Sequence, residues 1–109
     1  MKLYAEYIKE REDANLEYND KGFMSWKYDG NGVFILDAYV KPEYRKCGVV
    51  RNLLKLITEK TKTNEVYTTT DINANNWELS EKAIIALGFK KNTTIGSLNY
   101  YIMKIERED

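Results

Sequence analysis

The chain has 109 residues, with Lys plus Arg and Asp plus Glu at 17 each, and 43% of its residues are hydrophobic. This length and composition are typical of one folded domain, 1–109, and exclude wholesale disorder. The lack of His and the single Cys, Cys47, exclude His-dependent catalysis, a Cys or His metal centre and an internal disulfide. A net charge of zero argues against nucleic-acid binding, and no apolar run reaches the ~20 residues that span a membrane. Because the first residues also lack the features of a secretory signal, we expect a cytoplasmic protein without a membrane or metal partner.

The first forty residues predict a β-hairpin that is preceded by less certain elements. Lys2–Asp13 alternates like a strand but is rich in helix formers, so both assignments stay open, and residues 15–19 fit a short strand. Residues 23–28 and 33–40 predict two strands, and the turn sequence at 29–32 between them predicts an antiparallel hairpin. The second of these strands is apolar along almost its whole length, which predicts a central place in the sheet.

The following residues predict two helices separated by a strand. A helix that begins near Cys47 or Gly48 and ends near Thr61 has apolar residues at helical spacing along one face. Residues 66–72 alternate as in a strand, and residues 76–87 predict the second helix.

Local signals mark both ends of this second helix. Asn75 followed by Glu78 resembles a capping box, and Gly88 stands where a left-handed helix cap is usual. Residues 89–105 then predict a closing hairpin with its turn at 95–97. The predicted order is β-β-α-β-α-β-β, an α/β fold with mixed strand directions.

The segment between the central strand and the first helix indicates an anion-binding site. The N–H groups at a helix start attract anions, and Gly48 would let a ligand approach the backbone closely. Arg45, Lys46 and Arg51 crowd this helix start, where each cation is unfavourable by roughly 0.3–1 kcal/mol. Three such cations indicate an anionic ligand such as a pyrophosphate, and a solvated basic turn is the alternative.

The same segment carries a recognisable motif. It reads Tyr39-Val40-x-Pro42-x-Tyr44-Arg45-x-x-Gly48. This pattern resembles the acetyl-CoA-binding motif of the GNAT family of N-acetyltransferases, V-x-P-x-Y-R-x-x-G-x-G/A, which follows a central strand and opens a helix. The order of elements and the Gly-Phe end of the second helix are also similar over about residues 20–105. The resemblance implies a GNAT-like, mostly antiparallel mixed sheet flanked by helices.

The resemblance further implies direct transfer of an acetyl group from acetyl-CoA to a primary amine, without a covalent enzyme intermediate. Main-chain groups of residues 38–40 would pair with the acetyl group and the pantetheine arm, and N–H groups of residues 45–50 would hold the pyrophosphate. Asn76, or Asn75, would reach the pantetheine or adenine side. The implied cofactor-binding residues are Ala38, Tyr39, Val40, Arg45, Lys46, Cys47, Gly48, Val49, Val50, Arg51 and Asn76.

Three departures from the family pattern support an alternative hypothesis. Val50 replaces the second Gly/Ala of the motif, and its bulk would crowd the pyrophosphate. Ile84 stands where the family often has a Tyr that protonates the departing thiolate. The N-terminal region that commonly shapes the acceptor pocket is short. The alternative is a catalytically weak or inactive acyl-CoA-binding protein that acts through a protein partner.

Several side chains are candidates for the chemistry. Asp37 interrupts the apolar strand and could accept a proton from the amine or hold its ammonium group. Hydroxyl groups that could replace the missing acid belong to Ser80, Tyr67, Tyr100 and Tyr101. The acceptor stays open among small amines, antibiotics, peptide N-termini and protein lysines, and a homodimer that covers Tyr-rich sheet surface is a further open alternative.

Overall fold

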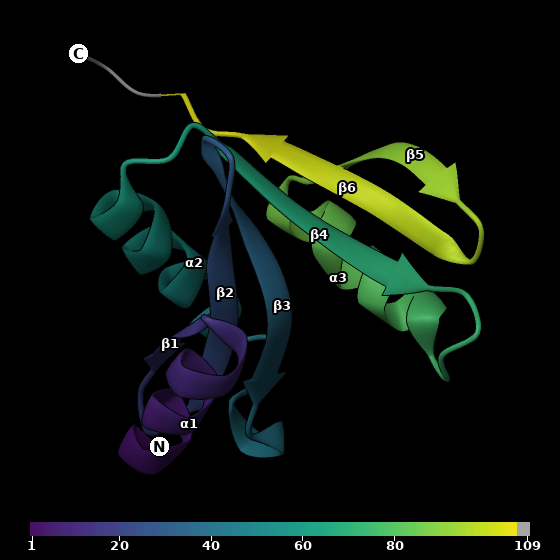
Figure 1. Cartoon of the computed structure of the whole chain (residues 1–109). Coiled ribbons are helices and arrows are strands. Elements are labelled where there is room, and N and C mark those ends of the chain that lie inside the picture. Colours follow the sequence, from purple (N-terminus) through teal and green to yellow (C-terminus); the bar gives the residue numbers. More distant parts are fainter. Residues whose placement is uncertain (107–109) are drawn as a thin grey trace.

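The computed structural model describes residues 1–106 and contains a mixed six-stranded sheet with helices on both faces (Figure 1). The strands are β1 (Asn15–Tyr18), β2 (Gly22–Asp29), β3 (Gly32–Val40), β4 (Glu65–Asp71), β5 (Lys90–Ile95) and β6 (Leu98–Lys104). The helices are α1 (Lys2–Glu12), α2 (Val49–Thr61) and α3 (Trp77–Leu87), with a 3-10 turn, η1, at Pro42–Tyr44. The strand order is β1-β2-β3-β4-β6-β5, and only β3 and β4 are parallel. The predicted mixed, mostly antiparallel sheet is therefore confirmed.

The N-terminal segment is a helix, which decides the open assignment of Lys2–Asp13. In α1 only Ile8 is buried, and the helix ends at Asp13, whose φ of 52° is left-handed. The alternating apolar side chains of this segment therefore do not face a core, and its helix-forming composition decides the conformation. Together α1 and β1 precede the predicted series of strands and helices, and the remaining elements follow in the predicted order.

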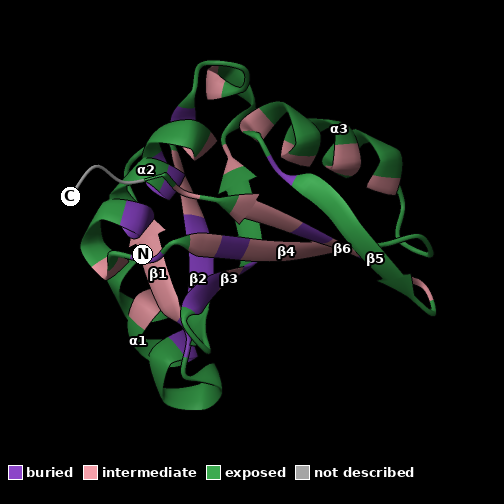
Figure 2. Cartoon of the chain, turned by 90° about the horizontal axis from the view of Figure 1, so that it is seen from above, coloured by how far each residue is buried: buried purple, intermediate pink, exposed green. Residues whose placement is uncertain are grey.

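Helix α2 anchors one layer of the core. Its buried side chains Val49, Leu53, Leu54 and Ile57 recur at helical spacing and pack on β2 and β3. Burial of each such side chain contributes roughly 1.5–3 kcal/mol before conformational entropy is counted. Figure 2 shows α2 and α3 on one face of the sheet and α1 on the other. The face that carries α2 and α3 is called the helical face below.

The start of α3 differs from the prediction. Its N-cap is Asn76, which has φ 61° and makes no side-chain capping hydrogen bond, so the capping box of Asn75 and Glu78 does not form. A capping box needs an N-cap in extended conformation, and the left-handed backbone of Asn76 places its side chain elsewhere. The other end agrees with the prediction, because Gly88 caps α3 with φ 113°.

Strands β3 and β4 separate soon after they meet. Their register pairs only Val33 with Val66 and Phe34 with Tyr67, and beyond this the Thr68 hydroxyl donates to the Ile35 carbonyl at 3.2 Å. Figure 1 shows the two strands diverging into a V, which is called the split below. β3 lies inside the sheet as predicted, but its residues 36–39 are exposed because β4 no longer covers them.

Candidate functional site

Two adjoining cavities follow the split. The first, of about 310 Å³, lies between β3, β4, α2 and α3, and the second, of about 640 Å³, lies against the loop that precedes α2. The residues that line both cavities are Ala38, Val50, Ala83 and Leu87. The two cavities therefore form one groove, which runs from the start of α2 into the split.

The loop at the mouth of this groove leaves backbone N–H groups free. The amides of Val49, Val50 and Arg51 have no acceptor within α2, and no side chain caps the helix at Gly48. Within residues 1–106, the amides of 46–48 also make no hydrogen bond. The Arg45 amide, by contrast, donates to the Pro42 carbonyl at 3.3 Å. The free amides consequently run from 46 to 51, one residue later than the resemblance implied.

Space for a ligand exists directly above these amides. Gly48 has φ 81°, and a Cβ built on it would meet no atom within 4 Å. Lys46 is also left-handed, with φ 65°, which helps to turn successive N–H groups in one direction. Because the amides are aligned with the positive end of the α2 dipole, the loop is suited to an anion.

The basic side chains around the loop are partly fixed. Arg45 donates from Nε to the Val40 carbonyl at 3.0 Å, and its guanidinium lies 5.7 Å from the Tyr39 ring centroid. Arg51 donates from Nη2 to the Ala86 carbonyl of α3 at 3.1 Å. Arg45, Lys46 and Arg51 all line the cavity, so positive charge is held around it. Three basic side chains around free amides favour an anionic ligand over a merely solvated basic turn.

The predicted cofactor-binding residues are brought together with two exceptions. Those that line the loop cavity are Ala38, Tyr39, Val40, Arg45, Lys46, Gly48, Val49, Val50 and Arg51. Cys47 lies in the same loop outside that lining, with its exposed thiol 3.6 Å from the Arg45 carbonyl oxygen. Asn76 is the exposed cap of α3 and lines neither cavity.

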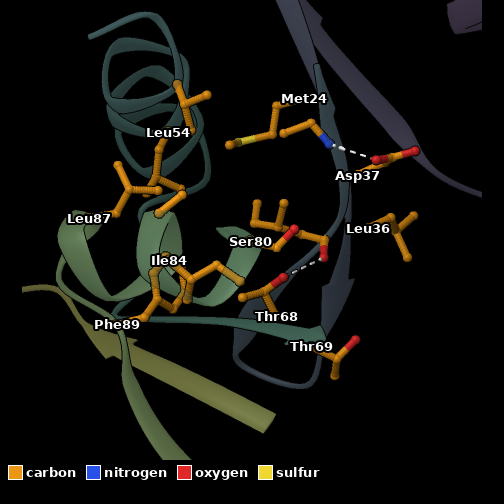
Figure 3. A pocket seen from close by; sticks show the side chains of 14 residues that line it. Met24, Leu36, Asp37, Leu54, Thr68, Thr69, Ser80, Ile84, Leu87 and Phe89 are labelled. Atoms are coloured by element: carbon orange, nitrogen blue, oxygen red, sulfur yellow. Dashed lines mark hydrogen bonds between the residues drawn. The ribbon is translucent and has the colours of Figure 1, made fainter. Parts of the chain in front are cut away.

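The cavity in the split has walls of different character on its two sides. Figure 3 shows Leu54, Ile84 and Leu87 on the helical side, with Asp37 and Leu36 across β3. Of the side chains described as lining this cavity, Asp37 alone carries a charge. Its Oδ1 accepts the N–H of Ala38 at 3.0 Å, and the residue is exposed.

The candidate acids lie in three different places. Ser80 lines the cavity in the split, where it joins Thr68 and Thr69 as the hydroxyl-bearing residues of that lining. Tyr101 is buried, its hydroxyl is 2.9 Å from that of Thr70, and it donates to Glu81 of α3. Burial and the bond to Glu81 raise the pKa of Tyr101 above its usual 10.0.

Tyr67 and Tyr100 line a third hollow, on the face of the sheet opposite α3. Tyr67 donates to Glu65, which raises the pKa of the Tyr67 phenol, and burial and the charge of Asp29 act in the same direction. Its hydroxyl is therefore neutral at ordinary pH. Of the four predicted acid candidates, the lining of the cavity in the split includes Ser80 alone.

Sequence reasoning missed part of the groove's walls. Thr68 and Thr69 are neighbours in β4 and point to opposite faces, yet both line the split, because β4 lacks a partner there on its β3 side. Ala83 and Leu87 come from the last two turns of α3, and only the packing of that helix brings them to the loop. The helical spacing of these two residues is the signal that could have placed them together.

A family profile matches the sequence, and solved structures match the fold. The sequence profile of the acetyltransferase (GNAT) family matches residues 14–84, about two thirds of the chain. The chain belongs to the GNAT family. No curated protein matches the sequence.

Among the described residues of this GNAT chain, no group of three or more Asp, Glu, His or Cys is arranged to hold a metal ion. Residues 1–106 also contain no helix that is long and apolar enough to cross a membrane.

Solved GNAT structures share its fold at low sequence identity. The PaiA N-acetyltransferase of Thermoplasma acidophilum, solved with coenzyme A, superposes with a TM-score of 0.70 at 23% identity over 95% of this chain and 70% of its own. Nourseothricin acetyltransferase gives 0.63 at 23% identity, over 86% of this chain and 66% of its own. A GNAT acetyltransferase from Staphylococcus aureus gives 0.69 at 15%, over 93% and 75%.

Proposed function

We propose that this GNAT acetyltransferase transfers the acetyl group of acetyl-CoA directly to a primary amine. The single observation that carries the proposal is the continuous groove from the free amides of 46–51 to the split. Acetyl-CoA carries a pyrophosphate at one end of a long, narrow, partly apolar arm. The pyrophosphate matches the amide-lined end of the groove, and the arm matches the end in the split. Support also comes from the coenzyme A complex of the structurally similar PaiA N-acetyltransferase.

The residues present fit each part of acetyl-CoA. The amides of 46–51 would bind the pyrophosphate, with Lys46 and Arg51 adding positive charge. The pantetheine arm would pass Val50 and Ala83 at the junction of the cavities and lie along the edge of β3 that β4 leaves unpaired. Main-chain groups of 38–40 would pair with the arm as a further strand does.

The chemistry follows from where the two reactants enter. A neutral primary amine attacks the thioester carbon, and a main-chain N–H of the β3 edge stabilises the negative oxygen that develops. Asp37, across β3 from the helices, holds the ammonium form and then accepts the proton that the nitrogen loses. The C–S bond breaks, the departing thiolate takes up a proton through the Ser80 hydroxyl, and we assign water as the group that returns a proton to that hydroxyl. The products are the acetylated amine and coenzyme A.

Val50 and Ile84 favour a second candidate function. Val50 stands at the junction of the two cavities, and Ile84 forms an apolar wall where the family often has a tyrosine. A chain that binds acyl-CoA but transfers its acyl group slowly or not at all, and acts through a protein partner, agrees with both residues. In either case we place the protein in the cytoplasm, and a homodimer stays an alternative to a monomer.

Ligand-induced stabilisation tests the binding part of the proposal. A ligand that binds only the folded state at 100 times its Kd stabilises it by about 2.7 kcal/mol, so acetyl-CoA, desulfo-CoA and ADP should each raise the Tm. Gly48→Trp fills the space above the amides and should abolish these shifts. Gly96→Trp is the matched control, because Gly96 also has a positive φ, 60°, and open space around its Cβ. Equal shifts in both variants would place the nucleotide elsewhere.

Release of coenzyme A thiol in the presence of primary amines separates the two candidate functions. An enzyme releases thiol only when an amine is present, and mass spectrometry should find the amine heavier by one acetyl group. Stabilisation by acetyl-CoA without amine-dependent thiol release would favour the binding protein instead.

A further inference from the structure

The split opens on two faces of the sheet, and only one of them is covered by α2 and α3. Directly paired residues of neighbouring strands point to the same face. Ser25 pairs with Asp37, and its neighbours Met24 and Trp26 belong to the core under the helices, so Ser25 and Asp37 point away from the helical face. Leu36, an extra residue at the irregularity in this ladder, lies beside Asp37 on the same side (Figure 3). An acceptor can therefore reach the split from the face opposite the nucleotide.

This face carries a row of large side chains next to the split. Phe34 pairs with Tyr67, and Tyr67 pairs with Ile102, so these three side chains share the face. In the next row Tyr100 pairs with Thr69, which lines the split. Phe34, Tyr67 and Tyr100 are half-buried and line a hollow of about 460 Å³. These three aromatic residues are called the aromatic shelf below.

The charges at the two ends of this face differ. At the split the lining offers the carboxylate of Asp37 and no other charge. Around the shelf, Lys27 pairs with Phe34, Lys90 with Ile102 and Lys104 with Glu65.

Two carboxylates also line the hollow. They belong to Asp29 and Glu65, and Glu65 already accepts the Tyr67 hydroxyl. No lysine is among the residues described as lining the hollow, so the three lysines lie around the shelf and not in it. An apolar group that lies on the three rings gains contact area.

We infer that the acceptor is a primary amine on an apolar, preferably aromatic, body. Its amine lies at Asp37 in the split and its body lies on the aromatic shelf. This inference rests on the proposed function, whose acceptor class it names. It predicts that amines without a ring, linear polyamines included, bind less tightly, because they leave the rings of the shelf uncovered.

Binding of three amines to the protein saturated with desulfo-CoA tests the inference. Desulfo-CoA lacks the reacting sulfur, so affinity is measured by calorimetry without turnover. The amines are 2-phenylethylamine, 1,5-diaminopentane and ethanolamine, which share a primary amine and differ in the group beyond it. We expect 2-phenylethylamine to bind at least about tenfold more tightly than either of the others.

A pair of variants localises the effect. Tyr100→Ala removes one ring of the shelf and should weaken binding of 2-phenylethylamine about tenfold, leaving ethanolamine unchanged. Tyr7→Ala, at an exposed tyrosine of α1, should change neither. The comparison of the three amines on the natural chain needs no variant, so it stands if Tyr100→Ala does not fold.

The possible outcomes separate the inference from the proposed function. Equal or tighter binding of 1,5-diaminopentane would overturn the inference and leave acetyl transfer intact, as would binding of none of the three amines at millimolar concentration. Failure of desulfo-CoA itself to bind would overturn the proposed function. A dimer in solution that Tyr100→Ala dissociates would mean that a second copy of the chain covers the shelf, which would also overturn the inference.

Discussion

Asp37 and Gly48 mark the two ends of the groove, and each has a property that its neighbours lack. Gly48 combines a positive φ of 81° with empty space where a side chain would stand. Asp37 is the charged residue in the lining of the split, and its carboxylate accepts a backbone N–H of its own strand. The first residue leaves access to the amides, and we propose that the second accepts a proton beside the thioester.

Asp37→Asn tests the second of these roles. The amide keeps the size of the side chain and can still accept the Ala38 N–H, but it cannot hold an ammonium group by charge or accept a proton. We expect kcat for amine acetylation to fall about 10²–10⁴-fold, the usual range for loss of a general base. The Tm shift with acetyl-CoA should be unchanged. Asp20→Asn, in the exposed turn before β2, is the control. A normal rate in Asp37→Asn would remove Asp37 from the mechanism.

Local sequence identified the residues of the loop, because helix starts, glycine and basic side chains act through neighbours in the chain. The same reasoning could not place Ser80 and Ile84 relative to Asp37, since these residues are more than forty positions apart and meet only through tertiary packing. Asn76 is a different case. Its position fits the family pattern, yet its left-handed backbone makes it a helix cap outside both cavities.

At the scale of elements, α3 is held to the sheet by polar contacts at its first turns. No residue of α3 is fully buried, but Glu81 accepts from Tyr101 of β6 and forms an ion pair with Lys91 at 3.3 Å. The bond from Tyr101 lowers the pKa of Glu81 below its ordinary 4.5, because it stabilises the ionised carboxylate. This contact positions the helix that supplies Ser80 and Ile84 to the split.

Tyr101→Phe should lower the Tm at neutral pH by roughly 4–8 °C, since it removes the bonds to Glu81 and Thr70. The difference from the natural chain should depend on pH at both extremes. The raised pKa of Tyr101 means that its contribution is complete below pH 10.0 and is lost as the pH rises above that value. The lowered pKa of Glu81 means that its contribution is complete above pH 4.5 and is lost in more acidic solution.

Thermal unfolding of both proteins between pH 3 and 11 measures this dependence. Tyr7→Phe is the control, because Tyr7 is exposed on α1 and makes no hydrogen bond within the described residues. A Tm difference that stays constant over the whole range would contradict the assigned pKa directions.

The sequence predicted some elements better than the pairing between them. The β2–β3 hairpin and α2 were confirmed because turn residues and one apolar face specify them locally. The split was not predictable from the pattern of Val, Thr and Ile in β4, because that pattern is the same whether or not a neighbour pairs. The length of the β3–β4 ladder is a property of two strands 25 residues or more apart, and the sequence of neither reveals it.

At the scale of the whole molecule, the groove connects the cavity at the loop before α2 to the cavity in the split. Ala83 lies at the junction, lines both cavities and is exposed. Its small side chain leaves room there for the pantetheine arm. The two cavities should therefore be separable by one substitution that leaves the loop amides unchanged.

Ala83→Trp should block the passage while it leaves the phosphate end open. We expect the Tm shift with acetyl-CoA to fall to that seen with ADP, because the pantetheine arm no longer adds contacts. Lys82→Trp is the matched control, since Lys82 is the exposed neighbour on α3 and lines neither cavity. Retention of the full acetyl-CoA shift in Ala83→Trp would show that the arm takes another route.

Because the β3–β4 ladder is short, the molecule consists of two arms that are joined at one end. One arm consists of α1, β1, β2, β3 and α2, the other of β4, β6, β5 and α3, and they are joined near Val33 and Val66. On the helical face, the Arg51–Ala86 hydrogen bond links α2 to α3. A ligand bound in the split contacts both arms and links them at a further point. We therefore expect bound acetyl-CoA to restrict the motion of one arm relative to the other, in addition to holding the reactants.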